Sequence, residues 1–141
     1  MRKVRVVFGS DDGEKVKNSH MGDSPRFYLY DIFENGEFEF VEKRENSVKD
    51  MEHAGDGKLM KISDILKDAE VLVAMRKSPN FKKIASKLKF LPVVIGRNDI
   101  KEVIKIISGE FENIFTKVTE RKNGVLNNSI FEIISGGSSE K

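Results

Sequence analysis

Hydrophobic residues fall into short runs separated by polar segments, and the spacing within each run predicts an element. Residues 3–8 are valine-rich and predict a strand. Residues 27–33 are aromatic and aliphatic, which is typical of a strand buried on both faces. An Asn-Gly pair, the strongest short hairpin signal, separates this run from residues 38–41. The alternation Phe-Glu-Phe there predicts an edge strand, whose charged side chains would protect it from further pairing.

The second half of the chain alternates between helical and strand patterns. Apolar residues recur at helical spacing in residues 59–69, 81–88 and 100–107. Between these segments, residues 71–75 and 91–95 are continuous apolar runs of the kind found in buried parallel strands. The predicted order is therefore three strands, a helix, a strand, a helix, a strand and a helix.

This order predicts an α/β fold. A meander followed by right-handed βαβ crossovers places the parallel strands beside the first strand and packs helices on the sheet. We expect a ribonuclease H-like three-layer fold, with a mixed five-stranded sheet and flanking helices. Residues 110–141 are expected to form a C-terminal extension that contains a further helix, a short β-prone segment at 129–134 and a disordered tail.

Composition narrows the class of protein. The 141 residues are a single-domain length, and 25 basic against 23 acidic side chains give no global attraction to nucleic acid. The absence of cysteine removes disulfides, thiolate nucleophiles and cysteine-ligated iron–sulfur clusters, and fits a cytoplasmic protein. We expect neither a signal peptide nor a membrane span, since no apolar run approaches the ~20 residues that a span requires. A charged fraction of 34%, rich in Lys and Glu, is thermophile-like.

Two polar loops hold the first candidate residues. Ser10 and Asp11 follow the first strand, and His20-Met21-Gly22 precede the second. If these strands pair, both loops lie at one end of the sheet, where open α/β sheets usually bind ligands. A neutral imidazole is a good transition-metal ligand, although a loop histidine can also simply bond to backbone. An Asp-Asp-Gly run can bind a hard cation but is more typical of turn chemistry.

His53 and two basic residues complete the candidates. His53 lies in a polar segment before the first helix and is either a solvated loop residue or a second metal ligand beside His20. Arg76 and Lys77 lie between the central strand and a helix, where they either hold an anion with the helix dipole or form a solvated basic turn. The chain has no Walker loop and no G-x-G-x-x-G, so nucleotide binding is unsupported.

The segment from His20 to Asp31 resembles the H-[FM]-G-x-[AS]-P-x-F signature of the dinitrogenase iron–molybdenum cofactor biosynthesis family, the NifX/NifB C-terminal type of domain. The order of elements extends this resemblance over residues 4–107. The resemblance implies a cofactor-binding domain over residues 1–109 with a ribonuclease H-like fold, and it implies His20 as a ligand. Many members carry Gly-x-Gly after the central strand, whereas this chain carries a basic pair, which suits an anionic cluster or small anion.

We therefore expect a non-catalytic module that binds or escorts a metal cluster, a metal complex or a small anion, with neither nucleic acid nor membrane as a partner. The alternative is a protein–protein interaction module that uses the extension. Its evidence is four apolar residues, Ile130, Phe131, Ile133 and Ile134, for which packing on the core is the favoured interpretation. A ribonuclease H-type nuclease is the weakest hypothesis, because the first strand carries no acid, Asp31 lies at the end of the second strand and Asp64 falls on a helix.

Overall fold

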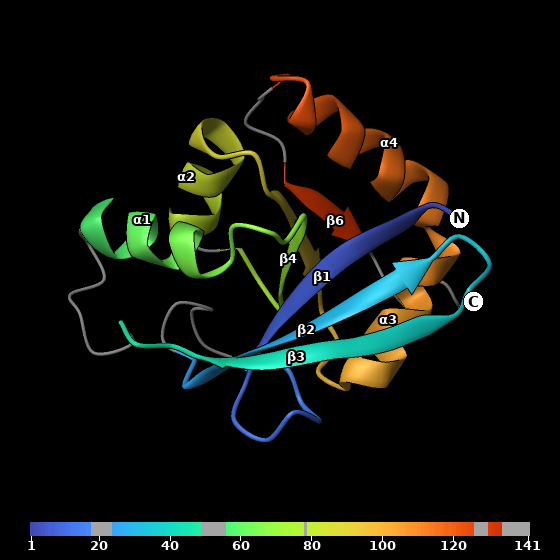
Figure 1. The fold of residues 1–141 in the computed structure, drawn as a ribbon, viewed down its shortest axis with the longest axis horizontal. Coiled ribbons are helices and arrows are strands. Elements are labelled where there is room, and N and C mark those ends of the chain that lie inside the picture. Colours follow the sequence, from blue (N-terminus) through green and yellow to red (C-terminus); the bar gives the residue numbers. More distant parts are fainter. Residues whose placement is uncertain (18–23, 49–55, 78, 126–129, 134–141) are drawn as a thin grey trace.

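The computed structural model describes residues 1–17, 24–48, 56–77, 79–125 and 130–133 (Figure 1). Its elements are, in order, β1 (Lys3–Ser10), β2 (Arg26–Phe33), β3 (Phe38–Glu45), α1 (Asp56–Ile65), β4 (Val71–Ala74), α2 (Pro79–Lys87), β5 (Leu91–Ile95), α3 (Ile100–Gly109), α4 (Phe111–Lys122) and β6 (Phe131–Ile133). The predicted order from β1 to α3 is confirmed, and α4 and β6 follow it.

All strands belong to one mixed sheet with the order β3-β2-β1-β4-β5-β6. The hairpin partners β1, β2 and β3 are antiparallel, whereas β4 is parallel to β1, β5 to β4 and β6 to β5. The edge position of β3 is confirmed, as is the Asn-Gly turn before it, in which Gly36 has a φ of +92°. The expectation of five strands is wrong, because the short segment Phe131–Ile133 pairs with β5 and adds a sixth.

The helices cover the two faces of the sheet in two pairs (Figure 1). Side chains of α3 and α4, such as Ile107 and Ile114, form one core with even-numbered residues of β1 such as Val6. On the other face, α1 and α2 pack Ile62 and Phe81 among residues of a second core. The result is a three-layer α/β arrangement.

The extension packs against the rest of the molecule. Phe131 and Ile133 are partly buried against the first core and Ile130 against the second. Arg121 of α4 is 4% exposed, and its guanidinium donates to backbone carbonyls at the end of α2, among them that of Ala85 at 2.9 Å. These contacts favour the packing interpretation over a free interaction surface. The predicted disordered tail lies outside the described residues.

Candidate functional site

Four chain segments meet at one end of the sheet. Ser10 at the end of β1 pairs with Arg26 at the start of β2, and Arg26 pairs with Glu45 at the end of β3. Because β4 runs parallel to β1, the turn after Ala74 leaves the sheet at this same end. Figure 1 shows the dark-blue loop after β1 beside the start of β2 and the end of β3. The predicted pairing of the first two strands is confirmed and places the end of β1 beside the start of β2, whereas the second polar loop, His20-Met21-Gly22, lies outside the described residues.

Ser10 organises the loop after β1. Its side chain is fully buried, and its hydroxyl donates to the carbonyl of Lys15 at 2.6 Å while accepting from the N–H of Gly13 at 2.9 Å. The carboxylate of Asp12 accepts from two further N–H groups, and the bond from Glu14 is the main cause of its lowered pKa. This is the turn chemistry that an Asp-Asp-Gly run predicts, so Ser10 acts as a structural anchor of the loop.

Asp11 ties this loop to its neighbours. Its carboxylate pairs with Lys17 at 3.0 Å, and its backbone carbonyl accepts from Arg26 at 3.2 Å. The side chain is 61% exposed. Asp11 therefore leaves its carboxylate at the surface, while its backbone fixes the loop against the first residue of β2.

A second anchor holds the segment that enters β2. Asn46 donates from its side chain to the carbonyl of Ser24 at 2.8 Å, and its own N–H donates to the carbonyl of Pro25 at 3.0 Å. Ser24 is fully buried, and within the described ranges its hydroxyl is the buried side-chain atom that lacks a hydrogen-bond partner. Sequence reasoning missed Ser24 and Asn46. The small residue of the signature was the only available signal, and it indicates tight packing rather than chemistry.

The described ion pair of the basic turn after β4 leads away from the loop after β1. Arg76 and Lys77 are both exposed and follow β4 at the end of the sheet where β1 ends and β2 starts. The ammonium of Lys77 pairs with Glu132 on β6 at 2.7 Å. The described contacts of Lys77 are thus with the far edge of the sheet, two strands beyond β4, and none joins it to the Ser10–Asp11 loop.

His20, Met21, Gly22 and His53 lie outside the described residues. Of the candidates, the structure therefore places Ser10, Asp11 and the two basic residues. Among the residues that are described, no group of three or more His, Asp or Glu side chains could hold a metal ion. The sequence also gave no signal for Lys58, in the first turn of α1, which is only 2% exposed.

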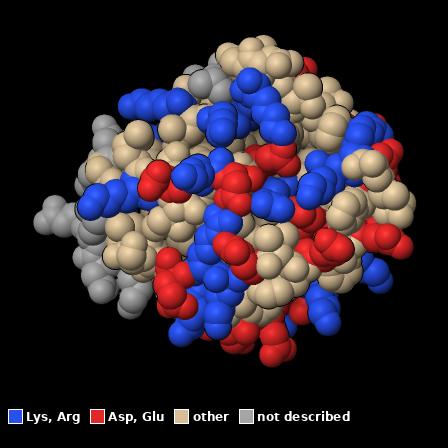
Figure 2. All heavy atoms as spheres, viewed as in Figure 1, with Lys and Arg blue, Asp and Glu red and all other residues tan. Residues whose placement is uncertain are grey.

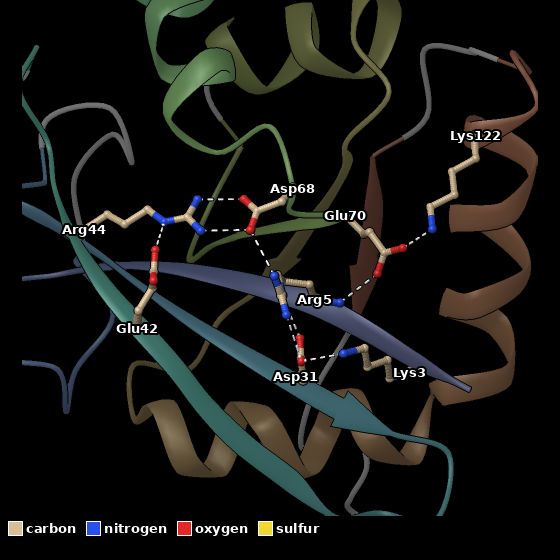
Figure 3. Close-up of polar contacts among 8 residues, drawn as sticks. All are labelled: Lys3, Arg5, Asp31, Glu42, Arg44, Asp68, Glu70 and Lys122. Atoms are coloured by element: carbon tan, nitrogen blue, oxygen red, sulfur yellow. Dashed lines mark hydrogen bonds and ion pairs between the residues drawn. The ribbon is translucent and has the colours of Figure 1, made fainter. Parts of the chain in front are cut away.

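The carboxylate required by the nuclease hypothesis is already neutralised. Asp31 accepts from Arg5 at 2.8 and 3.0 Å and from Lys3 at 2.9 Å, as Figure 3 shows. Burial raises the pKa of Asp31, but the hydrogen bonds from Arg5 and Lys3 outweigh burial and lower it. A carboxylate whose oxygens both face cations is poorly suited to Mg²⁺, which argues against a ribonuclease H-type site here.

Asp31 belongs to an ion-pair network that crosses the sheet (Figure 3). Arg5 also pairs with Asp68 at 2.9 Å, and Asp68 pairs with Arg44 of β3 at 2.6 Å. Elsewhere on the face shown in Figure 2, basic and acidic side chains are interspersed. The network joins β1, β2, β3 and the turn before β4, so its role in this structure is to hold elements together.

Comparison with known proteins identifies the family. The comparisons with curated proteins and with solved structures found no match. None of the described helices combines the length and apolar character that crossing a membrane requires. A family model described as dinitrogenase iron-molybdenum cofactor matches residues 2–109, which are more than half of the 141 residues and end with α3. The protein belongs to the dinitrogenase iron–molybdenum cofactor family.

Proposed function

We propose that this protein is a non-catalytic binding module that holds a metal cluster, a metal complex or a small anion at the carboxyl ends of β1 and β4. The family supports metal-cofactor handling in general. The proposed location of the binding site rests on one observation. The loop after β1 lies beside the start of β2 and the end of β3. We also propose that the fold is ribonuclease H-like, because the order β3-β2-β1-β4-β5 with β2 antiparallel to its neighbours supports that description.

His20 is the proposed principal ligand. It is three residues from Lys17 and four from Ser24, and both of these flanking residues lie at this end of the sheet. His53 is the proposed second ligand. Protein metal sites usually use three or four ligands. Two imidazoles would therefore leave positions on the metal for the cargo's own ligands, which suits a carrier that must release what it binds.

The surrounding residues would support this role without performing chemistry. Ser10 and Asp11 hold the loop, Met21 and Gly22 flank the proposed ligand, and the basic turn after β4 adds positive charge for an anionic cargo. We propose residues 1–109 as the cofactor-binding domain, residues 110–141 as its extension, and the cytoplasm as the location.

The two histidines make a direct test possible. With only two imidazoles in the chain, their ring C–H signals can be assigned by comparing His20→Ala and His53→Ala variants. Titration with molybdate, and separately with anaerobic Fe²⁺, should shift or broaden the His20 signal first. His53→Ala removes only the proposed second ligand, so the His20 signal should still respond but at a higher ligand concentration. An unchanged His20 signal at millimolar ligand would contradict the proposal.

A further inference from the structure

A small hollow lies between the C-terminal half of α4 and β6, which neighbour each other in the fold (Figure 1). Its volume is about 270 Å³, slightly below the ~300–1,000 Å³ of typical small-molecule sites, so its occupant must be small. All of its described lining except Leu91 follows residue 109, whereas the family match covers residues 2–109. The hollow is therefore a feature of the C-terminal extension.

The guanidinium of Arg121, which contributes to the lining, keeps one nitrogen for a ligand. Its Nε and Nη2 donate to carbonyls at the end of α2, and no bond of its Nη1 is described. In the part of the chain that the structure describes, the hydroxyl of Ser24 is the fully buried side-chain atom without a partner, so Nη1 must reach accessible space. Arg121 is 4% exposed, and it has no carboxylate partner among the described residues. A buried guanidinium of this kind favours a ligand that brings a carboxylate.

The charged lining of the hollow has both signs. Lys117 lies one helical turn before Arg121 and adds a second cation. The exposed Glu120 adds a carboxylate, for which the described residues supply no ion pair. Glu132 also belongs to the lining, but its carboxylate pairs with Lys77 at 2.7 Å. A ligand that carries one positive and one negative group matches this lining better than a simple anion or cation does.

The rest of the lining is apolar. Leu91 is 2% exposed, and Phe131 is partly buried against the core. The ammonium of Lys117 lies 5.8 Å from the centre of the Phe131 ring, so the charged and apolar parts of the lining adjoin. Val125 is 52% exposed, and a ligand with a hydrocarbon group would remove this surface from water. The lining therefore indicates a small zwitterion with an apolar body.

We propose that the hollow between α4 and β6 is a second binding site, which takes an apolar α-amino acid as its zwitterion. The Nη1 of Arg121 donates to the ligand's carboxylate, the carboxylate of Glu120 accepts from its ammonium group, and Val125 and Phe131 contact its side chain. This site does not rest on the proposed function. It uses neither histidine, and Leu91 begins β5 at the amino ends of the parallel strands, opposite to the proposed cargo site.

The test follows amide signals in ¹H–¹⁵N spectra of the full chain while L-leucine is added at constant pH and ionic strength. Saturable shifts should centre on Leu91, Lys117 and Phe131, with a dissociation constant of about 1 mM or below. Two analogues of leucine each lack one charged group: isocaproate has no ammonium and isopentylamine has no carboxylate. Each should bind about tenfold or more weakly than leucine, because one charge-assisted hydrogen bond is lost.

Substitution of an exposed residue tests the same assignment without removing the contacts of Arg121 to α2. Glu120→Gln should weaken leucine binding by about tenfold but not isocaproate binding, so the preference for leucine disappears. Glu37→Gln is the matched control and should leave both affinities unchanged, because it changes the net charge equally in the turn before β3, at the opposite edge of the sheet. The proposal is overturned if leucine gives no saturable local shifts, if isocaproate binds wild type as tightly as leucine does, or if Glu120→Gln keeps the preference for leucine.

Discussion

The buried guanidinium of Arg121 offers the sharpest test of how the extension is held. Its Nη2 donates to the carbonyls of Ile84 at 3.1 Å and Ala85 at 2.9 Å, and it also bonds to that of Leu88. Its Nε donates to the carbonyl of Lys89 at 3.3 Å. These carbonyls end α2 and have few partners within the helix. Arg121 therefore caps one helix from another, and the substitution Arg121→Met removes the cap while keeping an apolar stem of similar length.

The magnitude follows from two opposing effects. Hydrogen bonds to a charged group contribute about 1.5–3 kcal/mol each. Against this, burial disfavours the guanidinium cation, as its lowered pKa shows. In the variant, some of the carbonyls form hydrogen bonds with water instead. We therefore expect the free energy of unfolding to fall by about 2–4 kcal/mol, less than the summed contribution of all the lost hydrogen bonds. For a chain of this length that loss corresponds to a fall in Tm of roughly 6–16 °C.

The assay is urea unfolding monitored by circular dichroism, with two comparison variants. Arg26→Met removes an ion pair with Glu45, whose side chain is 70% exposed, and a hydrogen bond to the carbonyl of Asp11 at 3.2 Å, so the loss in free energy of unfolding should be about 1 kcal/mol. Arg121→Lys keeps the positive charge but loses the planar arrangement of N–H donors. Its free energy of unfolding should therefore lie between those of wild type and Arg121→Met. A free energy of unfolding for Arg121→Met within about 0.5 kcal/mol of wild type would refute the capping role.

Three further substitutions test the anchors and the network. Asp31 has a lowered pKa in the folded protein, so its stabilisation is present above the ordinary aspartate range near ~3.9 and is lost as the pH falls through the folded value. Asp31→Asn should therefore cost about 2 kcal/mol at pH 7 and flatten the acid limb of a stability–pH curve, and an unchanged limb would contradict this. Ser24→Ala removes a buried hydroxyl without a described partner, so it should raise the free energy of unfolding measured in denaturant by about 1 kcal/mol. A clear fall in that free energy would reveal a hydrogen bond from the hydroxyl. Gly13→Ala places a Cβ 2.6 Å from the ring of Tyr28 at a φ of +80°, so it should cost about 2 kcal/mol by thermal unfolding, and a neutral result would show that the loop relaxes freely.

The sequence predicted the elements of the family-matched region well, because their apolar runs are long and regular. The helix α3 is one example, since the apolar residues that recur at helical spacing in residues 100–107, such as Val103 and Ile107, are the ones buried in the core. By contrast, β6 has only three residues, too few to display a period, and it becomes a strand only because β5 offers an unpaired edge. The β-prone character of residues 129–134 was predicted, but their pairing with β5 as a sixth strand depends on tertiary contacts that local patterns do not encode.

The sequence predicted at which end of the sheet the candidate site lies, but not which partners its residues contact. The meeting of the end of β1, the start of β2 and the end of β4 at one end of the sheet follows from strand pairing, which the crossover rules anticipate. The partner of Lys77 is Glu132, 55 positions later in the chain, and no local pattern links the two. The burial of Lys58 and Arg121 likewise depends on neighbours brought in by folding, so both residues look like ordinary surface cations in the sequence. The roles of His20 and His53 stay predictions.

The central claim, that a metal-containing cargo is held through His20 at the end of the sheet, is tested most directly by elemental analysis. The protein would be purified from its native host anaerobically and without chelators, in parallel with His20→Ala, and metal would be measured per chain. We predict that iron or molybdenum accompanies the wild-type protein at a substantial fraction of one cargo per chain and falls to background in the variant. Equal metal in both proteins, or background levels in both, would contradict the claim.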